Sequence, residues 1–297
     1  MIDFAWGVNS NCKRPVAQSL QVVKKGLVII MALFGFIGVG NMGYPLLKSA
    51  ISTFGKEKVI FTSATKEHKE AVGKELGIPY SADNKTVAGN CKYLVLAVKP
   101  QTYPLVLDEI KDIVTNEQIV ISLAAGVTIA AMKEYFTKEV RVVRAMPNTP
   151  ALVLQGMTGI SFSQDSFSSE EREIIDQFFS SFGKYEVFEE NLMNAVAAAS
   201  GSSPAYVYMF IEALADSVVS YGIPRKKAYT LAAQTLLGAA AMVLQTGEHP
   251  GILKDNVCSP GGTTIAAVKA LEENGFRNAI MKATDACIKR AEDMSKK

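Results

Sequence analysis

The sequence predicts an α/β protein in which a Rossmann-type, doubly wound sheet domain is followed by an all-helical dimerisation domain. An apolar strand leads into a Gly-x-Gly-x-x-Gly turn and then into a helix. Strand and helix patterns alternate from there to about residue 189, and no further strand pattern follows Glu190. We therefore divide the chain into an extension (1–30), a sheet domain (31–189) and a helical domain (190–297).

Composition limits the classes of function. The chain has 297 residues, of which 48% are hydrophobic and 20% charged, enough for two domains with large cores. A net charge of +2 without a long charge run excludes a typical nucleic-acid-binding surface. The four cysteines form no C-x-x-C pair, and only two histidines occur, so we expect reduced thiols and no metal centre. We expect a cytoplasmic protein without a membrane partner.

The extension, residues 1–30, does not share the pattern of the rest, and Met31 directly precedes the first predicted strand. Lys24 and the apolar run after it resemble a signal peptide, but no Ala-x-Ala-like cleavage site follows. No other apolar run approaches the ~20 residues of a membrane span. We expect the functional chain to begin at Met31 and the extension to be dispensable.

The turn over residues 38–43 has the spacing and the flanks of a dinucleotide fingerprint. Gly38 allows a tight turn, Gly40 lets the backbone approach a pyrophosphate, and Gly43 lets the following helix lie close to the strand. The first amides of that helix (44–54) point at the phosphates, where the helix dipole favours negative charge. The alternative is a glycine-rich turn in some other α/β protein.

The remaining elements of the sheet domain repeat a strand–helix unit, which implies right-handed crossovers and a parallel sheet. Gly77 ends one predicted helix, and Ser168 with Glu171 forms a predicted capping box at the start of another. The predicted strands are residues 58–63, 93–98, 118–123, 140–145, 159–163 and 184–188, and the predicted helices are 67–76 and 168–182.

Ligands of such sheets bind beyond the carboxyl ends of the strands. Lys99 and Asn148 fall there, although Lys99 also fits a solvated strand end and Asn148 a turn before Pro150. The candidate cofactor-binding residues are Ile37, Gly38, Gly40, Asn41, Met42, Gly43, Ser63, Asn84, Ala97, Val98, Lys99, Pro100, Ala124, Ala125, Gly126 and Asn148.

The end of the second strand predicts NADPH as the preferred cofactor, with NADH possible. NADH-binding folds place a carboxylate there for the adenosine ribose. Residues 62–66 offer hydroxyls and one cation instead, and no acid occurs before Glu67. A 2′-phosphate suits such a strand end.

The helical domain predicts self-association. We expect helices over residues 204–221 and from Pro224 to Thr246, with residues 231–244 rich in Ala and Leu. A helix that is apolar on nearly all sides must be buried. The helical domain, residues 190–297, offers few neighbours that could bury it. An interface in a two-fold dimer is the simplest solution. The alternative is a self-contained helical bundle.

A second motif, residues 255–264, is expected to form a loop of small residues before a helix over 265–273. Such a loop offers free backbone amides and the hydroxyls of Thr263 and Thr264 to an anion. A simple capped helix would explain the threonines, but it explains the Pro-Gly-Gly run less well.

Six segments together resemble the pyrroline-5-carboxylate reductase family. They are Gly-Phe-Ile-Gly-Val-Gly-Asn-Met-Gly (35–43), Ala-Val-Lys-Pro (97–100), Ala-Ala-Gly-Val-Thr-Ile (124–129), Met-Pro-Asn-Thr-Pro (146–150), Gly-Ser-Ser-Pro-Ala-Tyr (201–206) and Asp-Asn-Val-Cys-Ser-Pro-Gly-Gly-Thr-Thr (255–264). The resemblance runs from Met31 to the C-terminus. It implies an NAD(P)H-binding sheet domain and an interlocked dimer that can assemble further. It also implies that the protein catalyses the last step of proline synthesis.

The same resemblance implies the substrate site. The substrate would be 1-pyrroline-5-carboxylate, whose carboxylate is held at Gly261, Gly262, Thr263 and Thr264, with Asn256 and Glu190 nearby. Thr263, Thr264 and Asn256 are the candidate catalytic residues. Because a protonated iminium is already electrophilic, catalysis needs orientation and desolvation more than a strong general acid.

Two alternative functions remain open at this point. A β-hydroxyacid dehydrogenase would share the architecture, but it needs a lysine in the helical half, and residues 200–206 contain none. A non-catalytic NADP-binding protein is the second alternative, and the intact motif at 255–264 argues against it.

Overall fold

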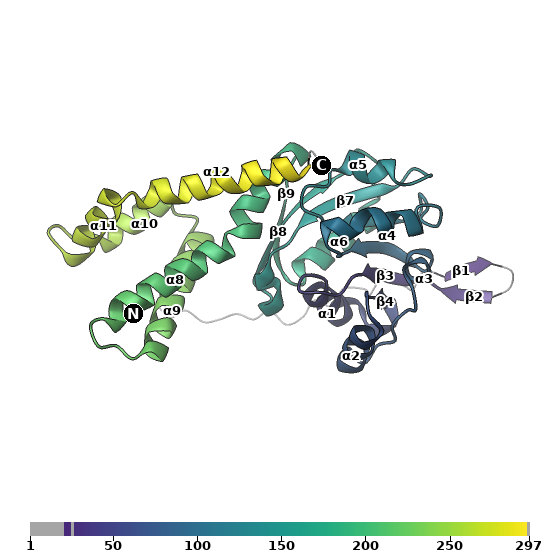
Figure 1. Cartoon of the computed structure of the whole chain (residues 1–297), viewed down its shortest axis with the longest axis horizontal. Coiled ribbons are helices and arrows are strands. Elements are labelled where there is room, and N and C mark those ends of the chain that lie inside the picture. Colours follow the sequence, from purple (N-terminus) through teal and green to yellow (C-terminus); the bar gives the residue numbers. More distant parts are fainter. Residues whose placement is uncertain (1–20, 25–26, 296–297) are drawn as a thin grey trace.

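The computed structural model describes residues 21–24 and 27–295, and it divides into a sheet region and a helical region (Figure 1). The sheet region contains a seven-stranded sheet with helices on both faces. The helical region leaves the sheet as two arms, one formed by α8 and α9 and the other by α10, α11 and α12. The predicted fold class, including the change to helices after Glu190, is confirmed.

The strands follow the order β4-β3-β5-β6-β7-β8-β9. The first five strands in this order, β4 to β7, are parallel to one another. Strand β8 runs antiparallel to β7, and β9 is parallel to β8. The expected wholly parallel sheet is therefore wrong at β8, because the short connection after β7 leaves no room for a helical crossover. The strands are β3 (Ala32–Ile37), β4 (Val59–Thr62), β5 (Cys91–Leu96), β6 (Ile119–Ser122), β7 (Arg141–Met146), β8 (Gly156–Phe162) and β9 (Gly183–Val187).

Within the extension, β1 (Gln21–Lys24) and β2 (Leu27–Ile30) pair antiparallel as a separate two-stranded ribbon. This ribbon does not add a strand to the seven-stranded sheet. The rest of the extension, including Cys12, lies outside the described residues.

Helices cover the two faces of the sheet with different side chains. On one face, α1 (Gly43–Phe54) and α6 (Ser169–Ser180) enclose an aromatic core that includes Phe34, Phe36 and Phe178. On the other face, α3 (Asn84–Gly89), α4 (Tyr103–Ile110) and α5 (Ile129–Glu134) pack on aliphatic side chains. Both layers are almost completely buried within the single chain.

The predicted helix ends are present at the two places where the sequence carries a clear signal. α2 (Lys66–Leu76) ends at Gly77, which is left-handed with φ of 65°. At α6, Ser168 Oγ accepts from the amide of Glu171, whose carboxylate accepts from the amide of Ser168. The capping box is therefore confirmed.

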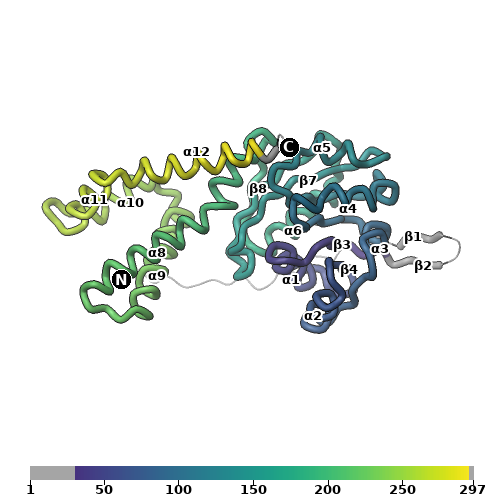
Figure 2. The backbone as a smooth tube through the Cα atoms, viewed as in Figure 1, coloured from purple at the N-terminus to yellow at the C-terminus, as the bar shows by residue number. Residues whose placement is uncertain are grey.

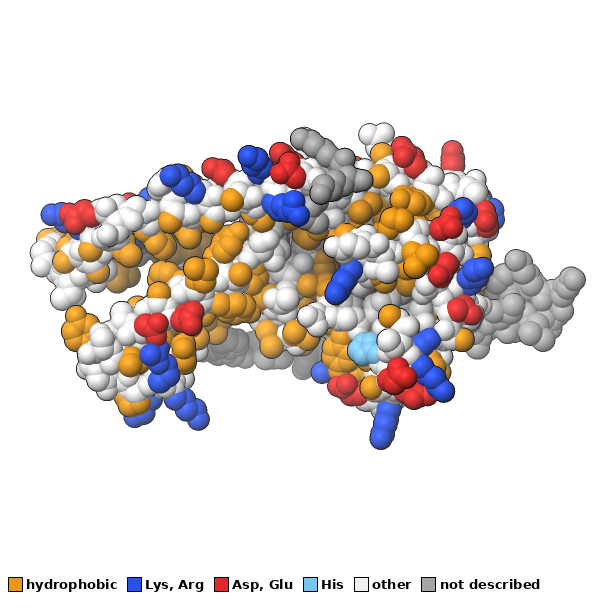
Figure 3. Space-filling view, viewed as in Figure 1, with side chains coloured by type: hydrophobic (Ala, Val, Ile, Leu, Met, Phe, Trp, Pro, Cys, Tyr) orange, Lys and Arg blue, Asp and Glu red, His pale blue; other side chains and the backbone are white. Residues whose placement is uncertain are grey.

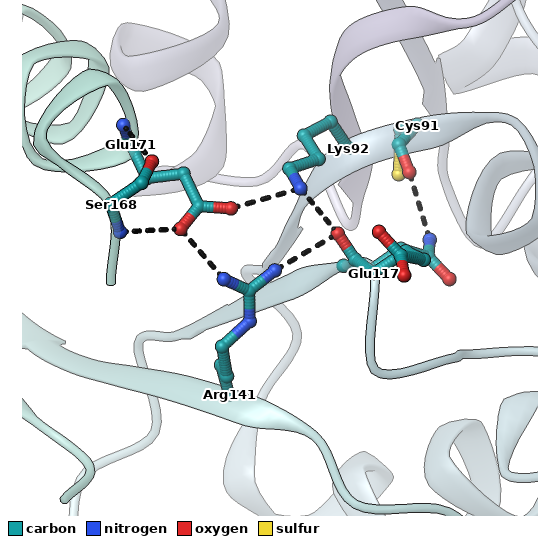
Figure 4. Close-up of polar contacts among 7 residues, drawn as sticks. Cys91, Lys92, Glu117, Arg141, Ser168 and Glu171 are labelled. Atoms are coloured by element: carbon teal, nitrogen blue, oxygen red, sulfur yellow. Dashed lines mark hydrogen bonds and ion pairs between the residues drawn. The ribbon is translucent and has the colours of Figure 1, made fainter. Parts of the chain in front are cut away.

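A cluster of charges joins the amino ends of the strands, at the edge opposite the glycine turn (Figure 4). The Glu171 carboxylate contacts Lys92 Nζ at 2.9 Å and the Arg141 guanidinium at 2.6 Å. Burial alone would raise the pKa of Glu171, but the Lys92 ammonium, the Ser168 amide and Arg141 together lower it to about 2. The cluster links β5 and β7 to α6 and helps to fix the layers.

The helical region begins with α7 (Met193–Val196) and a π-helical turn, η5 (Ala197–Ser202). The long helices that follow are α8 (Pro204–Val219), α9 (Arg225–Thr246), α10 (Pro250–Val257), α11 (Thr263–Glu273) and α12 (Phe276–Ser295). α12 runs back toward the sheet region and packs against α7 and η5 (Figure 2).

Two expectations about this region are wrong. Residues 255–257 belong to α10, and α11 begins at Thr263, so the loop is only residues 258–262. Pro250 follows a capping His249 and starts a helix that the expected loop did not allow for. Helix α9 also has the length and composition of a membrane span, a property that core helices of soluble proteins share.

The helical region exposes its apolar side chains in the single chain. In α8 only Ala215 is buried, and in α9 only Ala228 and Ala232. Hydrophobic side chains line the facing sides of the two arms (Figure 3). A surface of this extent marks an interaction site.

Candidate functional site

The glycine turn lies at the mouth of a groove of about 540 Å³ at the carboxyl end of β3, β4 and β5. Of the predicted cofactor residues, Ile37, Gly38, Gly40, Ser63, Asn84, Ala97, Val98 and Lys99 line this groove. The others do not line this groove but follow the carboxyl ends of strands in the same sheet: Asn41, Met42 and Gly43 after β3, Pro100 after β5, Ala124, Ala125 and Gly126 after β6, and Asn148 after β7.

Two glycines of the turn, Gly38 and Gly43, are required for different steric reasons, whereas Gly40 faces open space. Gly38 has φ of 91°, and a Cβ there would lie 2.7 Å from Val98 Cγ1. A Cβ on Gly40 would meet no atom within 4 Å, so that backbone faces open space where a ligand can approach. A Cβ on Gly43 would lie 2.3 Å from the carbonyl oxygen of Gly38, which explains the close packing of α1 on the turn.

The start of α1 suits a phosphate. Met42, the N-cap residue, makes no side-chain cap hydrogen bond, and the first turn of α1 carries no acid. The amides there are not used by a side-chain cap, and the helix dipole favours an anion. The His68 ring, from α2, contacts the carbonyl oxygen of Val39 at 2.7 Å through Nε2 and so supports the turn.

The far end of the groove collects Ser63, Lys69 and Asn84. Lys69 Nζ donates to the carbonyl of Ala82 at 2.7 Å, and the Asn84 amide donates to Glu109 at 2.7 Å. Sequence reasoning missed Lys69, because nothing in the local pattern shows that the first turns of α2 face the groove.

Asn148 is buried, and its side chain joins two regions of the protein. Its Oδ1 accepts from the amide of Met157 at 2.9 Å, and its Nδ2 donates to the carbonyl of Ser200 at 3.0 Å. Ser200 lies in the π-helical turn η5, a kind of irregularity that is frequent at functional sites. Asn148 therefore fixes the edge of the sheet to the start of the helical region.

Glu190 lies where the chain leaves β9 and enters the helical region, in η4 (Glu190–Leu192). Its Oε1 accepts from the amide of Ile129 at 2.5 Å and from the Arg144 guanidinium at 3.3 Å. The Arg144 side chain is only 4% exposed, and its burial lowers the pKa of the guanidinium, an effect that Glu190 opposes. Glu190 thus has partners from α5 and β7.

Residues 258–262, which remain as a loop from the predicted motif at 255–264, lead into the first turn of α11 without a side-chain cap or an acid. Gly261 has φ of 67°, and a Cβ on Gly262 would lie 2.4 Å from Ser259 Oγ. The left-handed backbone at Gly261 therefore requires a glycine, and the amides at Thr263 and Thr264 have no side-chain cap. Asn256 is exposed in the last turns of α10.

Within one chain the two halves of the expected site do not meet. The α10–α11 end forms the tip of one helical arm, whereas the turn between β3 and α1 lies in the sheet region (Figure 1). Glu190 and Asn148 lie near the sheet, and Asn256, Gly261, Gly262, Thr263 and Thr264 lie on the arm. No cluster of three or more His, Cys, Asp or Glu side chains that could hold a metal occurs in residues 21–24 and 27–295.

Both regions match families of known function. Residues 190–294 match the family model for pyrroline-5-carboxylate reductase dimerisation, and residues 33–126 match that for NADP oxidoreductase, coenzyme F420-dependent. A pyrroline-5-carboxylate reductase of Escherichia coli (strain K12) is 42% identical over 265 residues, covering 88% of this chain and 98% of that protein. Pyrroline-5-carboxylate reductase 2 of Homo sapiens is 40% identical over 265 residues, covering 87% and 82%.

A solved structure resembles the whole arrangement. The pyrroline carboxylate reductase of Plasmodium falciparum, determined with NADP bound, has a TM-score of 0.80 at 32% identity. The match covers 89% of this chain and 98% of that structure.

Proposed function

Because the chain belongs to the pyrroline-5-carboxylate reductase family, we propose that its substrate carboxylate binds at the start of α11 and its NADPH along the sheet groove. The enzyme reduces 1-pyrroline-5-carboxylate to L-proline with NAD(P)H, the last step of proline biosynthesis. The β-hydroxyacid dehydrogenase and the non-catalytic alternatives are not favoured. The observation that carries the substrate site is the uncapped, acid-free first turn of α11 after Gly261 and Gly262.

The separation of the loop from the groove leads to a two-subunit site. The match of residues 190–294 to a dimerisation family indicates self-association. The exposed apolar sides of α8 and α9 need a partner to cover them. In a two-fold dimer a surface meets its own copy, and the arm of one subunit can reach the sheet of the other. We infer that Thr263 and Thr264 of one protomer complete the groove of its partner.

The chemistry asks little of acid–base side chains. When bound, the nicotinamide of NADPH would supply a hydride to the carbon of the substrate's iminium, whose nitrogen already carries the proton of the product amine. The α11 amides and the Thr264 hydroxyl would hold the carboxylate, and the small residues around them would exclude water.

The proposed domain limits are residues 31–189 for cofactor binding and 190–297 for substrate binding and dimerisation.

The proposed cofactor preference is NADPH over NADH. The groove presents Ser63 and the Lys69 ammonium after β4, and Asn84 beyond them. A cation with hydroxyl and amide donors suits a 2′-phosphate. Lys69→Met should raise the KM for NADPH and leave the KM for NADH nearly unchanged.

The deciding experiment is oxidation of NADPH or NADH by the purified chain with 1-pyrroline-5-carboxylate, followed at 340 nm. Proline should form in an amount equal to the NADPH consumed. Absence of turnover would overturn the proposed substrate, and equal catalytic efficiency with both cofactors would overturn the preference. A 3-hydroxy acid with NADP⁺ serves as the control for the dehydrogenase alternative.

We also propose that the protein is cytoplasmic. Helix α9 passes the length and composition test for a membrane span, but it lies within the stretch that matches the dimerisation family. A subunit interface accounts for its apolar surface without a membrane. Fractionation of cells that express the chain, with the pellet washed at high salt, would test this location.

A further inference from the structure

We propose that Glu190 is a positioning residue that fixes the loop after β6, at the nicotinamide end of the groove, by bonding the first amide of α5. The inference rests on the proposed function, because it assigns that loop to the cofactor. It differs from the substrate-binding role that the family resemblance implied for Glu190.

The first step is the geometry of the Glu190 carboxylate. A single oxygen, Oε1, accepts from the amide of Ile129 at 2.5 Å and from Arg144 at 3.3 Å. Ile129 is the first residue of α5, and Thr128 Oγ1 bonds the amide of Ala131 two residues later. Two of the otherwise unpaired amides at this helix start are therefore satisfied, one by Thr128 within the chain segment and one by a residue 61 positions away.

The start of α5 is joined directly to the loop that we assign to the cofactor. Residues 123–128 connect β6 to α5 and include Ala124, Ala125 and Gly126, the predicted cofactor residues of this strand end. Gly126 has φ of 78°, a left-handed conformation that glycine adopts without strain. Hydrogen bonds hold both ends of the loop. At one end the amide of Leu123 bonds Leu96 and the Tyr103 hydroxyl, and at the other end Ile129 bonds Glu190.

The third step is the role of Arg144. It points from β7 with its side chain buried, and its Nε has no hydrogen-bond partner among the described residues. A buried guanidinium is costly without a counter-charge, so Glu190 is held toward Arg144 and cannot turn freely to solvent. Arg144 thereby keeps the carboxylate in place against the start of α5.

Glu190 lies at the boundary between the sheet region and the helical region. It is the first residue that matches the dimerisation family model, which starts at residue 190. Asn148 makes a second link between the same regions through Ser200. Both links join the nicotinamide end of the sheet to the first turns of the helical region. The geometry therefore couples the position of the cofactor loop to the region that carries the proposed substrate loop.

The test separates the hydrogen bond from the ion pair with two double variants. Glu190→Gln with Arg144→Met removes both charges but retains an oxygen for the Ile129 amide. Glu190→Ala with Arg144→Met removes both charges and that oxygen. The single variant Glu190→Gln leaves Arg144 buried without a counter-charge, and it should have the lowest Tm of the three.

The expected result is a kinetic difference between the two double variants. Misplacement by about 1 Å can cost up to about a hundredfold in rate. The alanine double variant should therefore have a kcat about tenfold or more below that of the glutamine double variant. The Kd for NADP⁺ should change less than about threefold, since neither Glu190 nor Arg144 lines the groove that holds the glycine turn, Ser63 and Asn84. The primary isotope effect with NADPH deuterated at the transferred hydrogen should rise in the alanine double variant, because hydride transfer becomes slower.

A matched control lies at the other end of α5. Lys133 pairs with Asp165 at 2.5 Å, and Lys133→Met with Asp165→Asn removes a link of similar kind away from the loop. Its kcat and isotope effect should equal those of the wild type.

Four results would overturn the proposal. Equal kcat and equal isotope effects in the two double variants would show that the link is only structural. A loss carried wholly by the KM for 1-pyrroline-5-carboxylate would show a direct substrate contact. An equal loss in the Lys133 control would show general loosening of α5. A kcat that falls in the alanine double variant together with a smaller isotope effect would show that a step other than hydride transfer had been slowed. Failure of the wild type to turn over the substrate would instead count against the proposed function.

Discussion

The sheet region and the helical region bury their apolar side chains in different ways. In the sheet region, both faces are covered by helices of the same chain, and large side chains such as Phe34, Phe36 and Phe178 are completely buried. In α8 and α9 only alanines are buried, while Leu231, Leu237 and Leu244 are more than half exposed.

This difference teaches that one region completes its core within the chain and the other region needs a second chain. Burial of apolar surface contributes roughly 25 cal/mol per Å², and the helical arms obtain little of it alone. The same arms carry the proposed substrate loop. Under the proposed function, association and catalysis would be linked in the helical region, whereas folding and cofactor binding would be linked in the sheet region.

The largest expected effect comes from a charge on the exposed apolar surface of α9. Leu237 is 59% exposed in the single chain, in the stretch that we propose the partner covers. Leu237→Asp should give monomers or aggregates, because an unpaired charge buried in an interface is very costly. Light scattering measures the outcome.

Tyr135→Asp is the matched control, since Tyr135 is an exposed apolar residue of the sheet region. It should leave the association state unchanged. A wild type that is monomeric in light scattering would remove the basis of the comparison.

The second expected effect concerns the stability of the sheet region. The pKa of Glu171 is about 2, below its ordinary value of 4.5, because Lys92, Ser168 and Arg141 outweigh the effect of burial. The charged cluster therefore stabilises the fold fully above about pH 4.5, and this contribution is lost as the pH falls toward 2. Glu171→Gln should lower the free energy of unfolding by roughly 2–4 kcal/mol near neutral pH.

Denaturant unfolding between pH 2 and pH 7 checks both the size and the sign. The variant should lose the part of the acid dependence that comes from Glu171. Glu70→Gln breaks an exposed pair with Lys66 at 3.8 Å and should cost less than about 1 kcal/mol. A pH profile of Glu171→Gln that is parallel to the wild type would contradict the assignment.

The third effect is catalytic and lies on the helical arm. The Thr264 hydroxyl should add one charge-assisted hydrogen bond to the substrate carboxylate, worth roughly 1.5–3 kcal/mol. Thr264→Ala should therefore lower kcat/KM by about ten- to a hundredfold and leave the Kd for NADPH nearly unchanged.

Steady-state kinetics and a separate NADPH titration distinguish these two quantities. Thr137→Ala is the control, because that hydroxyl bonds only the carbonyl of Lys111 among the described contacts, at 3.3 Å. An unaffected kcat/KM, or a loss explained by weaker NADPH binding, would count against the proposed carboxylate site.

The smallest effect is expected from the extension. The ribbon of β1 and β2 is not part of the seven-stranded sheet, and the pattern of the sheet starts at Met31. Deleting residues 1–30 should leave Tm, association and kcat/KM close to wild type. An insoluble or inactive truncated protein would show that the extension packs on the sheet.

The sequence by itself determined the strands of the sheet in chain order and the helices with clear end signals, because these signals are local. Each signal acts within a few residues. The signals are the spacing of hydrophobic residues, Gly77 at a helix end, the Ser168 capping box and the glycine turn. The fold class, the position of the glycine turn in a groove and the helical nature of residues after 190 therefore followed from the sequence. Helix α10 did not follow from the sequence, since its last residues were assigned to the loop of small residues that comes after it.

Only the tertiary structure decided which residues meet. The reversal of β8, the closure of the Glu190 carboxylate on Ile129 and Arg144, and the engagement of Asn148 by Ser200 join residues that are distant in sequence. The position of the α10–α11 loop on an arm, away from the groove of its own chain, also depends on long-range packing. Long-range contacts of this kind depend on how whole layers pack, and no local pattern encodes them.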